Sequence, residues 1–172
     1  MQEIGKIVIE LDREKAPSTV DNFIGYCRDH FYIGTIFHRV IKGKRVHGGK
    51  YVPGMIPKNV KLPLHNESDN GLKNLRGTIA MARERQPHSA TSEFFINTAD
   101  NPNYDFEDKT FFGWGYCVFG KVVEGMDIID EIEQLPTDFH GIHHADVPVK
   151  NYVIDKIQVM RNRVTFNIVL EE

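Results

Sequence analysis

The chain has 172 residues, of which 41% are hydrophobic and 26% are charged, and its formal net charge is -3. This length and composition are typical of one soluble globular domain with a substantial core. A slightly acidic chain gives no reason to expect nucleic acid or an anionic membrane as a partner, and no apolar run approaches the roughly 20 residues that span a bilayer.

The two cysteines and the N-terminus bear on the location of the protein. Cys27 and Cys117 lie in apolar stretches, which favours buried free thiols in a reducing compartment. The chain begins without the charged-then-apolar pattern of a signal peptide. We therefore expect a cytoplasmic protein, and we expect it to be a monomer.

The first half of the chain predicts a strand, a helix and a longer strand. Residues 5–11 alternate in hydrophobicity, as a strand does. Pro17 at a first helical position precedes apolar residues at helical spacing, so a helix is expected from Pro17 to about Asp29. A strand should run from Phe31 to Ile41, and prolines and glycines make residues 50–63 a loop.

The second half predicts more short strands and a second helix. A short amphipathic helix follows Gly125, and residues 135–149 are expected to form a loop. The expected strands are Leu75–Ala82, Glu93–Thr98, Trp114–Val123 and Tyr152–Met160. Many short strands with only two helices predict a mainly β fold, either an antiparallel barrel or a sandwich closed by helices.

The C-terminal residues 161–172 form a separate case. Apolar residues alternate with others from Val164 to Leu170. This pattern predicts an extra strand, either at an edge of this fold or paired with another chain. A disordered tail is the alternative, but the segment is too apolar for that to be preferred.

Arg39 is the first candidate functional residue. Alternation along its expected strand places Phe37, Arg39 and Ile41 on one face. A planar, always-charged donor beside apolar walls suits a mostly apolar ligand that carries one acceptor. An arginine on a half-buried strand is also commonly an ion-pair partner, and the pattern alone does not decide between these roles.

The chain resembles the cyclophilins, and its closest likeness is to their cytoplasmic bacterial branch. The resemblance is carried by Phe37–Val40 with Gly48–Gly49, by Arg76–Ala82, by Ser92–Asn97, by Gly113–Phe119 and by Val118–Asp127. It implies a closed eight-stranded antiparallel barrel capped by two α-helices. It also implies a single domain over residues 1–160, with residues 161–172 as a C-terminal extension.

The resemblance implies peptidyl-prolyl cis-trans isomerase activity in protein folding. Arg39 matches the catalytic donor of the family, and no metal or cofactor is implied. The expected partners are proline-containing peptides and unfolded or folding proteins. The residues that the resemblance assigns to substrate binding are Phe95, Ala82, Arg83, Met81, His47, Tyr104, Tyr116 and Glu93.

Individual roles follow from the same resemblance. Phe95 matches the floor of the proline pocket, and Tyr116 falls where many members have His. Tyr104 is the preferred second wall, with Asn103 and Phe106 as alternatives. Ala82 and its neighbour match positions that bind the peptide mainly through main-chain groups.

The sequence departs from the family pattern just before Gly48. Lys44, Arg45 and His47 stand where the family usually has Phe, Met and Gln. Two cations cannot line a dry pocket unpaired, so either they swing outward, or acidic groups approach them, or the pocket is reshaped. This departure leaves a second function open, a cyclophilin-fold module that binds proline peptides with weak or no catalysis.

One further cluster of residues stands out. His140, His143 and His144 lie close together in the expected loop at 135–149. Such clusters bind zinc or nickel in some proteins. Their spacing fits neither a helix nor a strand, so an exposed loop without a metal is the preferred interpretation.

Overall fold

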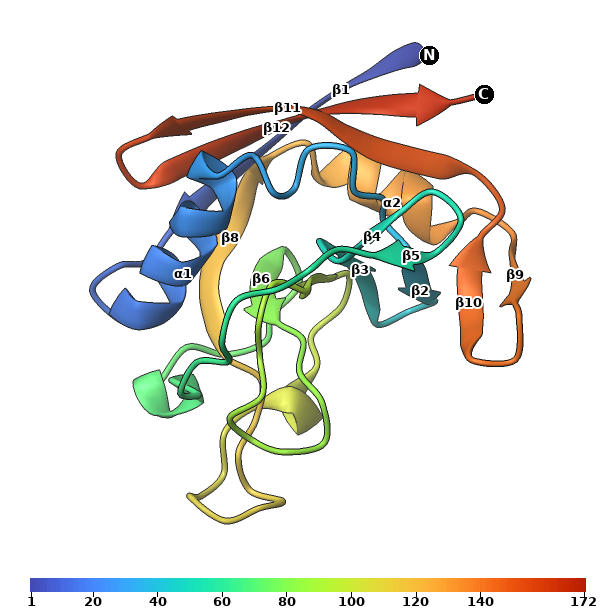
Figure 1. Cartoon of the computed structure of the whole chain (residues 1–172). Helices are drawn as coiled ribbons and strands as arrows, with labels where there is room; N and C mark the ends of the chain where they lie inside the picture. The colour runs from blue at the N-terminus through green and yellow to red at the C-terminus, as the bar shows by residue number, and fades with distance from the viewer.

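A computed structural model describes residues 1–172, and its main feature is an eight-stranded antiparallel sheet that curls on itself (Figure 1). In sheet order the strands are β11 (Asn151–Met160), β12 (Arg163–Glu171), β1 (Gln2–Leu11), β8 (Val118–Glu124), β6 (Thr78–Met81), β7 (Phe94–Asn97), β3 (Arg45–Gly48) and β2 (Arg39–Ile41). Every neighbouring pair is antiparallel. The predicted mainly β class is confirmed.

The barrel closes through the segment before β2 rather than through β2 itself. Ile36 forms a single antiparallel bridge with Val153 of β11. Phe37 N donates to Tyr152 O at 3.1 Å, and Ile154 N donates to Thr35 O at 3.0 Å. The predicted closed barrel is therefore slightly overstated, because no continuous ladder joins the two edge strands.

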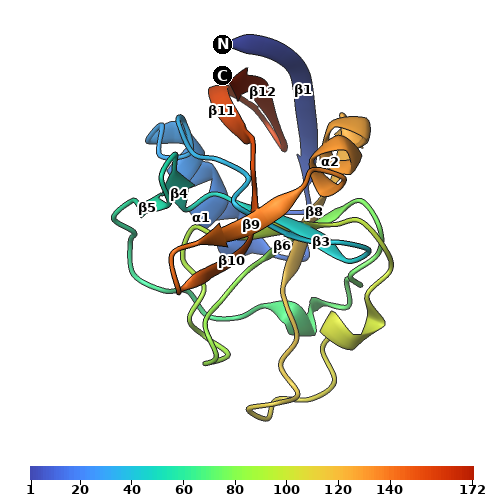
Figure 2. The same ribbon diagram turned by 90° about the vertical axis from the view of Figure 1, so that its right-hand side faces the viewer.

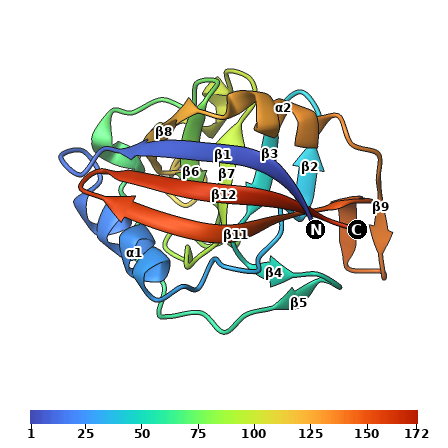
Figure 3. The ribbon, with the colours of Figure 1, turned by 90° about the horizontal axis from the view of Figure 1, so that it is seen from above.

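Two helices cover the sheet on opposite sides, as Figure 3 shows from above. Helix α1 (Pro17–Arg28) begins with a proline, which has no N–H to lose at a first helical position. Helix α2 (Met126–Glu133) turns Ile128, Ile129 and Ile132 into the core. Neither helix has the length and apolar character needed to cross a membrane.

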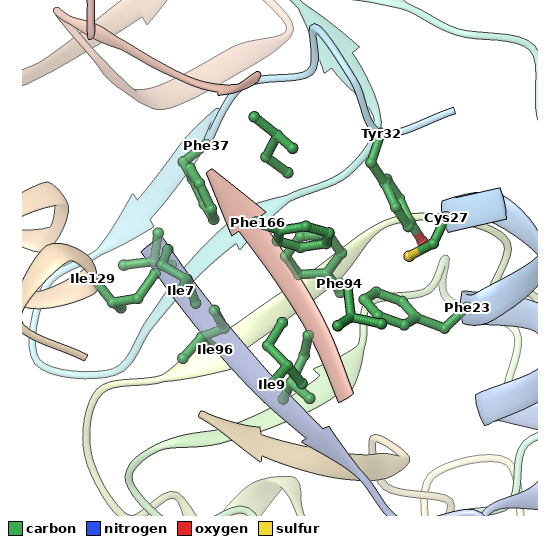
Figure 4. Packing of buried hydrophobic residues seen from close by; sticks show 14 of the residues in the cluster. Ile7, Ile9, Phe23, Cys27, Tyr32, Phe37, Phe94, Ile96, Ile129 and Phe166 are labelled. Atoms are coloured by element: carbon green, nitrogen blue, oxygen red, sulfur yellow. The ribbon is translucent and has the colours of Figure 1, made fainter. Parts of the chain in front are cut away.

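The interior of the barrel is filled by aromatic and branched side chains (Figure 4). Phe23 of α1 lies 5.9 Å from Phe94 of β7, ring centroid to ring centroid, and 5.1 Å from Phe119 of β8. Phe166 of β12 packs against the same group at 6.1 Å from Phe94. The core thus joins α1 to strands that are far apart in the sequence.

The C-terminal strand is an internal member of the barrel. The expected strand is present as β12, but it lies between β1 and β11 and is neither an edge strand nor free for another chain. Figure 3 shows these three strands side by side, with the two termini close together. Gln2 is paired with Leu170, so β1 and β12 begin and end at the same corner of the barrel.

Two small hairpins stand outside the main sheet. Residues 135–149, which were expected to be a loop, contain the antiparallel pair β9 (Thr137–His140) and β10 (His144–Pro148). In Figure 2 this hairpin crosses in front of the barrel, and β10 lies against β2. The second hairpin joins β4 (Tyr51–Val52) to β5 (Ile56–Pro57). Residues of both hairpins lie beside Arg39 and line the same hollow.

Candidate active site

Arg39 begins the short edge strand β2 with an exposed side chain. No hydrogen bond or ion pair within the chain engages its guanidinium. The predicted strand Phe31–Ile41 is too long, because only residues 39–41 are in the ladder. Phe37 is 1% exposed and packs in the core, so it does not share a face with Arg39. The arginine is left facing solvent at the rim of the barrel, free to bind a ligand.

A hollow of about 290 Å³ lies beside Arg39. Its walls come from β2, the start of β4, the β4–β5 turn, the residue before β7, and the β9–β10 hairpin. They are formed by His38, Arg39, Tyr51, Met55, Glu93, His143, His144 and Ala145. The hollow is rich in polar groups, and Glu93 supplies the one carboxylate among its lining residues.

A chain of side-chain contacts runs from Glu93 through His47 and Arg45 to Tyr104. His47 Nδ1 lies 2.7 Å from a carboxylate oxygen of Glu93. Arg45 Nε donates to His47 Nε2 at 2.8 Å, and Arg45 Nη1 donates to the hydroxyl of Tyr104. Arg45 and His47 belong to β3, and Glu93 directly precedes β7. The two strands are paired, with His47 directly opposite Phe95.

These contacts fix the protonation state of His47. A guanidinium N–H only donates and a carboxylate only accepts, so Nε2 is the unprotonated nitrogen and Nδ1 carries the proton. Burial lowers the pKa of His47 to about 4, although Glu93 acts in the opposite direction. Burial alone raises the pKa of Glu93, but hydrogen bonds from His38 and His47 outweigh it and hold that pKa well below its ordinary value. Near neutral pH the site contains a neutral imidazole and a carboxylate.

Three aromatic rings pack edge to face next to this network. Phe95 lies 5.8 Å from Tyr104 and 5.4 Å from Tyr116, and the two tyrosines are 5.5 Å apart, centroid to centroid. Ala82 belongs to the same buried cluster. Arg83 lies over Tyr116, with its guanidinium carbon 4.7 Å from the ring centroid, and donates to the carbonyl of Trp114 at 2.9 Å.

The structure brings together most of the residues assigned to the site from sequence. Arg39, His47 and Glu93 lie at or beside the hollow, and the aromatic cluster adjoins them through His47, whose ring is 5.4 Å from that of Phe95. Met81 is the exception. It is 2% exposed and packs in the barrel interior with the main core, so its side chain does not face the others.

The two unexpected cations take different positions. Lys44 is exposed in the β2–β3 turn, and its carbonyl oxygen accepts from Thr98 N at 2.9 Å. Arg45 turns inward, with its guanidinium carbon 4.9 Å from the Tyr104 ring centroid and 5.7 Å from that of Phe95. Of the three outcomes considered from sequence, the outward orientation applies to Lys44. Arg45 lies over the aromatic rings, and no carboxylate forms an ion pair with it.

Sequence reasoning missed His38 and the position of the β9–β10 hairpin. His38 is 4% exposed, its Nε2 lies 3.5 Å from Glu93, and its Nδ1 has no hydrogen-bond partner. His143 and His144 line the hollow although their spacing gave no sign of it. Alternation along the expected strand puts His38 on the face opposite Arg39, whereas both residues line the hollow. Nothing in that pattern indicated a carboxylate partner.

His38, His47 and Glu93 have the spacing of a possible metal site, because their donor atoms lie within 4.8 Å of one another. Ligation through His47 Nδ1 would move the imidazole proton to Nε2. There it would face the N–H of Arg45, donor against donor. The free ring N–H of a metal-bound histidine normally donates to an acceptor. The arrangement therefore suits a hydrogen-bond network better than a metal.

Comparison with known proteins gives consistent matches along the chain. The family described as "Cyclophilin type peptidyl-prolyl cis-trans isomerase/CLD" matches residues 1–159. Peptidyl-prolyl cis-trans isomerase B of Escherichia coli (strain K12) is 52% identical over 155 residues, covering 90% of this chain and 94% of the relative. Peptidyl-prolyl cis-trans isomerase cyp18 of Streptomyces antibioticus is 47% identical over 156 residues, covering 91% and 93%.

Among solved structures, a cyclophilin type peptidyl-prolyl cis-trans isomerase of Cryptosporidium parvum is similar with a TM-score of 0.69 and 23% identity. The match covers 98% of this chain and 99% of that one. At this identity the likeness concerns the fold. It extends over β12, which lies beyond the residues that the family match covers.

Proposed function

The chain belongs to the cyclophilin-type peptidyl-prolyl cis-trans isomerase family, and from that premise we propose that Arg39 is its catalytic donor, acting beside a proline pocket built on Phe95. The enzyme class follows from the family and from relatives that are themselves named as isomerases. These matches favour the isomerase over the binding module. The residue roles are the part that we propose.

The reaction needs no covalent intermediate. Rotation about a peptide bond has a barrier of ~18–20 kcal/mol because the C–N bond has partial double-bond character. An X–Pro bond populates both isomers, and uncatalysed exchange takes on the order of tens to hundreds of seconds. A catalyst must bind the twisted bond better than either planar form. Twisting gives the proline nitrogen a lone pair, which a well-placed donor can stabilise.

The observation that carries this assignment is the unpaired guanidinium of Arg39. It lines the hollow beside Glu93, and no group of the protein competes for its N–H donors. An arginine offers five donors in a rigid fork, enough to bond the prolyl nitrogen and hold a carbonyl oxygen at once. His47, its direct partner across the β2–β3 ladder, is neutral and does not repel it.

The substrate side of the proposal rests on the neighbouring cluster. Phe95 with Tyr104 and Tyr116 offers the apolar faces on which a proline ring packs. Ala82 belongs to the same cluster and the Arg83 guanidinium lies over Tyr116, so we assign the main chain of these two residues to peptide binding. The Cryptosporidium parvum relative was studied in the presence of the dipeptide Ala-Pro. We extend proline-peptide binding to this chain, with unfolded or folding proteins as natural substrates.

We also propose that the enzyme works as a cytoplasmic monomer. Cys27 and Cys117 are both free and buried. Burial raises the pKa of each thiol well above its ordinary value, so both are inert as nucleophiles. Free thiols fit a reducing compartment. Size-exclusion chromatography with light scattering tests the oligomeric state, and a mass near twice 19.8 kDa would contradict a monomer.

Two-dimensional exchange NMR on a short proline peptide tests the catalytic assignment. Wild type should give cis–trans exchange cross-peaks at catalytic concentration, and Arg39→Ala should lower the exchange rate by about 10²–10³, the usual loss for one transition-state donor. Lys156→Ala, which removes an exposed cation on β11, is the matched control and should exchange as wild type does. Equal rates for wild type and Arg39→Ala would refute the role of Arg39.

The same experiment at two pH values tests the state of His47. Because its pKa is about 4, His47 is neutral at pH 6 and at pH 8, and the exchange rate should agree within about twofold between them. A large rise from pH 6 to pH 8 would contradict a His47 that is already neutral at pH 6.

A further inference from the structure

Arg45 covers the surface that the proline ring needs. Its guanidinium carbon lies over both Phe95 and Tyr104, at 5.7 and 4.9 Å from the ring centroids. Phe95 is only 1% exposed as a result of this and of the packing of the tyrosines. The hollow at the site is lined by Arg39 and Glu93, not by Phe95. A proline ring therefore reaches Phe95 only when Arg45 moves.

The contacts that hold Arg45 in place are all with neutral groups. They are His47 Nε2, the Tyr104 hydroxyl and two aromatic faces. No carboxylate of the chain lies within ion-pair distance of its guanidinium, and Glu93 is engaged by the two histidines. A half-buried cation without an anion is a costly arrangement, and an arriving carboxylate offers it a planar, two-point partner.

Three other cations without carboxylate partners lie on the same hairpin as Arg45. Arg39, Lys42 and Lys44 lie with Arg45 on the β2–β3 hairpin. None of the four forms an ion pair, while other surface cations such as Arg76 do. The chain as a whole carries a net charge of -3. Four cations without a carboxylate partner thus lie on the hairpin that carries Arg39 and Arg45.

We propose that Arg45 closes the proline pocket in the free enzyme and that a carboxylate next to the proline draws it aside, so that the enzyme prefers X–Pro segments with an adjacent Asp or Glu. The inference rests on the proposed function, because it concerns the substrates of the same site. Ion pairing with the carboxylate replaces the contacts with His47 and Tyr104. The vacated space above Phe95 then accepts the proline ring.

Exchange NMR on matched peptides tests the preference. The peptides differ only by Glu against Gln, placed directly before the proline in one pair and directly after it in the other. For wild type at low salt, we expect at least one Glu peptide to react about tenfold faster in kcat/KM than its Gln partner. The ratio should fall in 0.5 M NaCl, because salt screens charges at a partly exposed site.

Two variants test the role of Arg45 itself. Arg45→Met should speed the Gln peptides and bring the Glu/Gln ratio to within about twofold of one. Tyr104→Phe keeps the cation but removes one of its anchors, so it should speed the Gln peptides while retaining part of the preference. Lys156→Met removes a distant exposed charge and should keep the wild-type ratio. Thermal unfolding of each variant confirms that it is folded.

The outcomes separate this inference from the function on which it rests. A wild-type ratio near one for both peptide pairs overturns the acidic preference. Equal slowing of Glu and Gln peptides in folded Arg45→Met also overturns it, because Arg45 would then assist every substrate rather than cover the pocket. Absence of exchange for every peptide, in wild type and in all variants, would instead refute the proposed isomerase site.

Discussion

His47, which is buried at the site, gives a sharp stability prediction. The pKa of His47 is about 4 in the folded protein, against 6.5 for an ordinary histidine. Between these values the unfolded chain binds a proton that the folded protein excludes, so stability falls as the pH falls. From well above pH 6.5 down to pH 4.5, His47 should contribute a loss of about 2.5 kcal/mol in the free energy of unfolding.

The assay is urea denaturation of wild type and His47→Gln from pH 7.5 to 4.5. Glutamine does not titrate, so the variant should lack this part of the decline, and the difference between the two curves should change by about 2.5 kcal/mol. His88 and His144 also have lowered pKa values, but both are present in each protein and their contributions cancel.

Glu93 does not interfere within this window. Its folded pKa is depressed, so the stability that it contributes is present above its unfolded value of 4.5 and is lost only as the pH falls further. His140→Gln, at an exposed position of the β9–β10 hairpin, controls for the removal of any imidazole. Parallel curves for wild type and His47→Gln would refute a buried neutral His47.

Two further predictions test the packing of the barrel, both by urea denaturation. Gly49 has φ +87°, and a Cβ there would lie 2.6 Å from the ring of Phe94. Gly49→Ala should therefore cost about 1–3 kcal/mol more than Gly34→Ala, which has φ +86° and no atom within 4 Å; equal losses would show that only the backbone angle matters. Phe166→Ala should cost about 3–5 kcal/mol because that side chain is 1% exposed in the core, and a loss below about 1 kcal/mol would mean that β12 is not an integral strand.

Periodicity predicted the helices and the core strands well. The apolar spacing after Pro17 and Gly125 gave both helices, and alternation gave β1, β11 and β12. Each of these elements buries one face, and a buried face requires apolar residues at a regular spacing in the sequence. The β9–β10 hairpin was missed because its residues are mostly exposed, so no pattern of burial marks it.

The position of β12 between β1 and β11 could not be predicted from the sequence, for a different reason. Alternation reports that a strand has a buried face, but it does not report which strands lie beside it. The alternation in residues 161–172 predicted a strand either at an edge of this fold or paired with another chain. In the structure the two longest ladders are those of β12 with β1 and β11. The extension is therefore part of the barrel wall.

The structure brings together most of the residues assigned to the site from sequence, but their electrostatics could not be predicted. A long cationic side chain has both an outward and an inward arrangement available, and Lys44 and Arg45 take one each. The choice for Arg45 depends on Tyr104, from a loop nearly sixty positions away, and on the tautomer of His47. Neither can be deduced from local spacing.

The departures from the family pattern at positions 45 and 47 depend on each other. Arg45 stays near the aromatic rings because His47 offers it an unprotonated nitrogen, and His47 offers that nitrogen because Glu93 accepts the proton on the other side. A protonated His47 would instead place a second cation against Arg45. Removing Arg45 alone would leave a buried acceptor on His47 unsatisfied, at a cost of about 1–3 kcal/mol. The polar chain from Glu93 to Tyr104 is therefore one unit, and a change in any member alters how firmly Arg45 is held over Phe95.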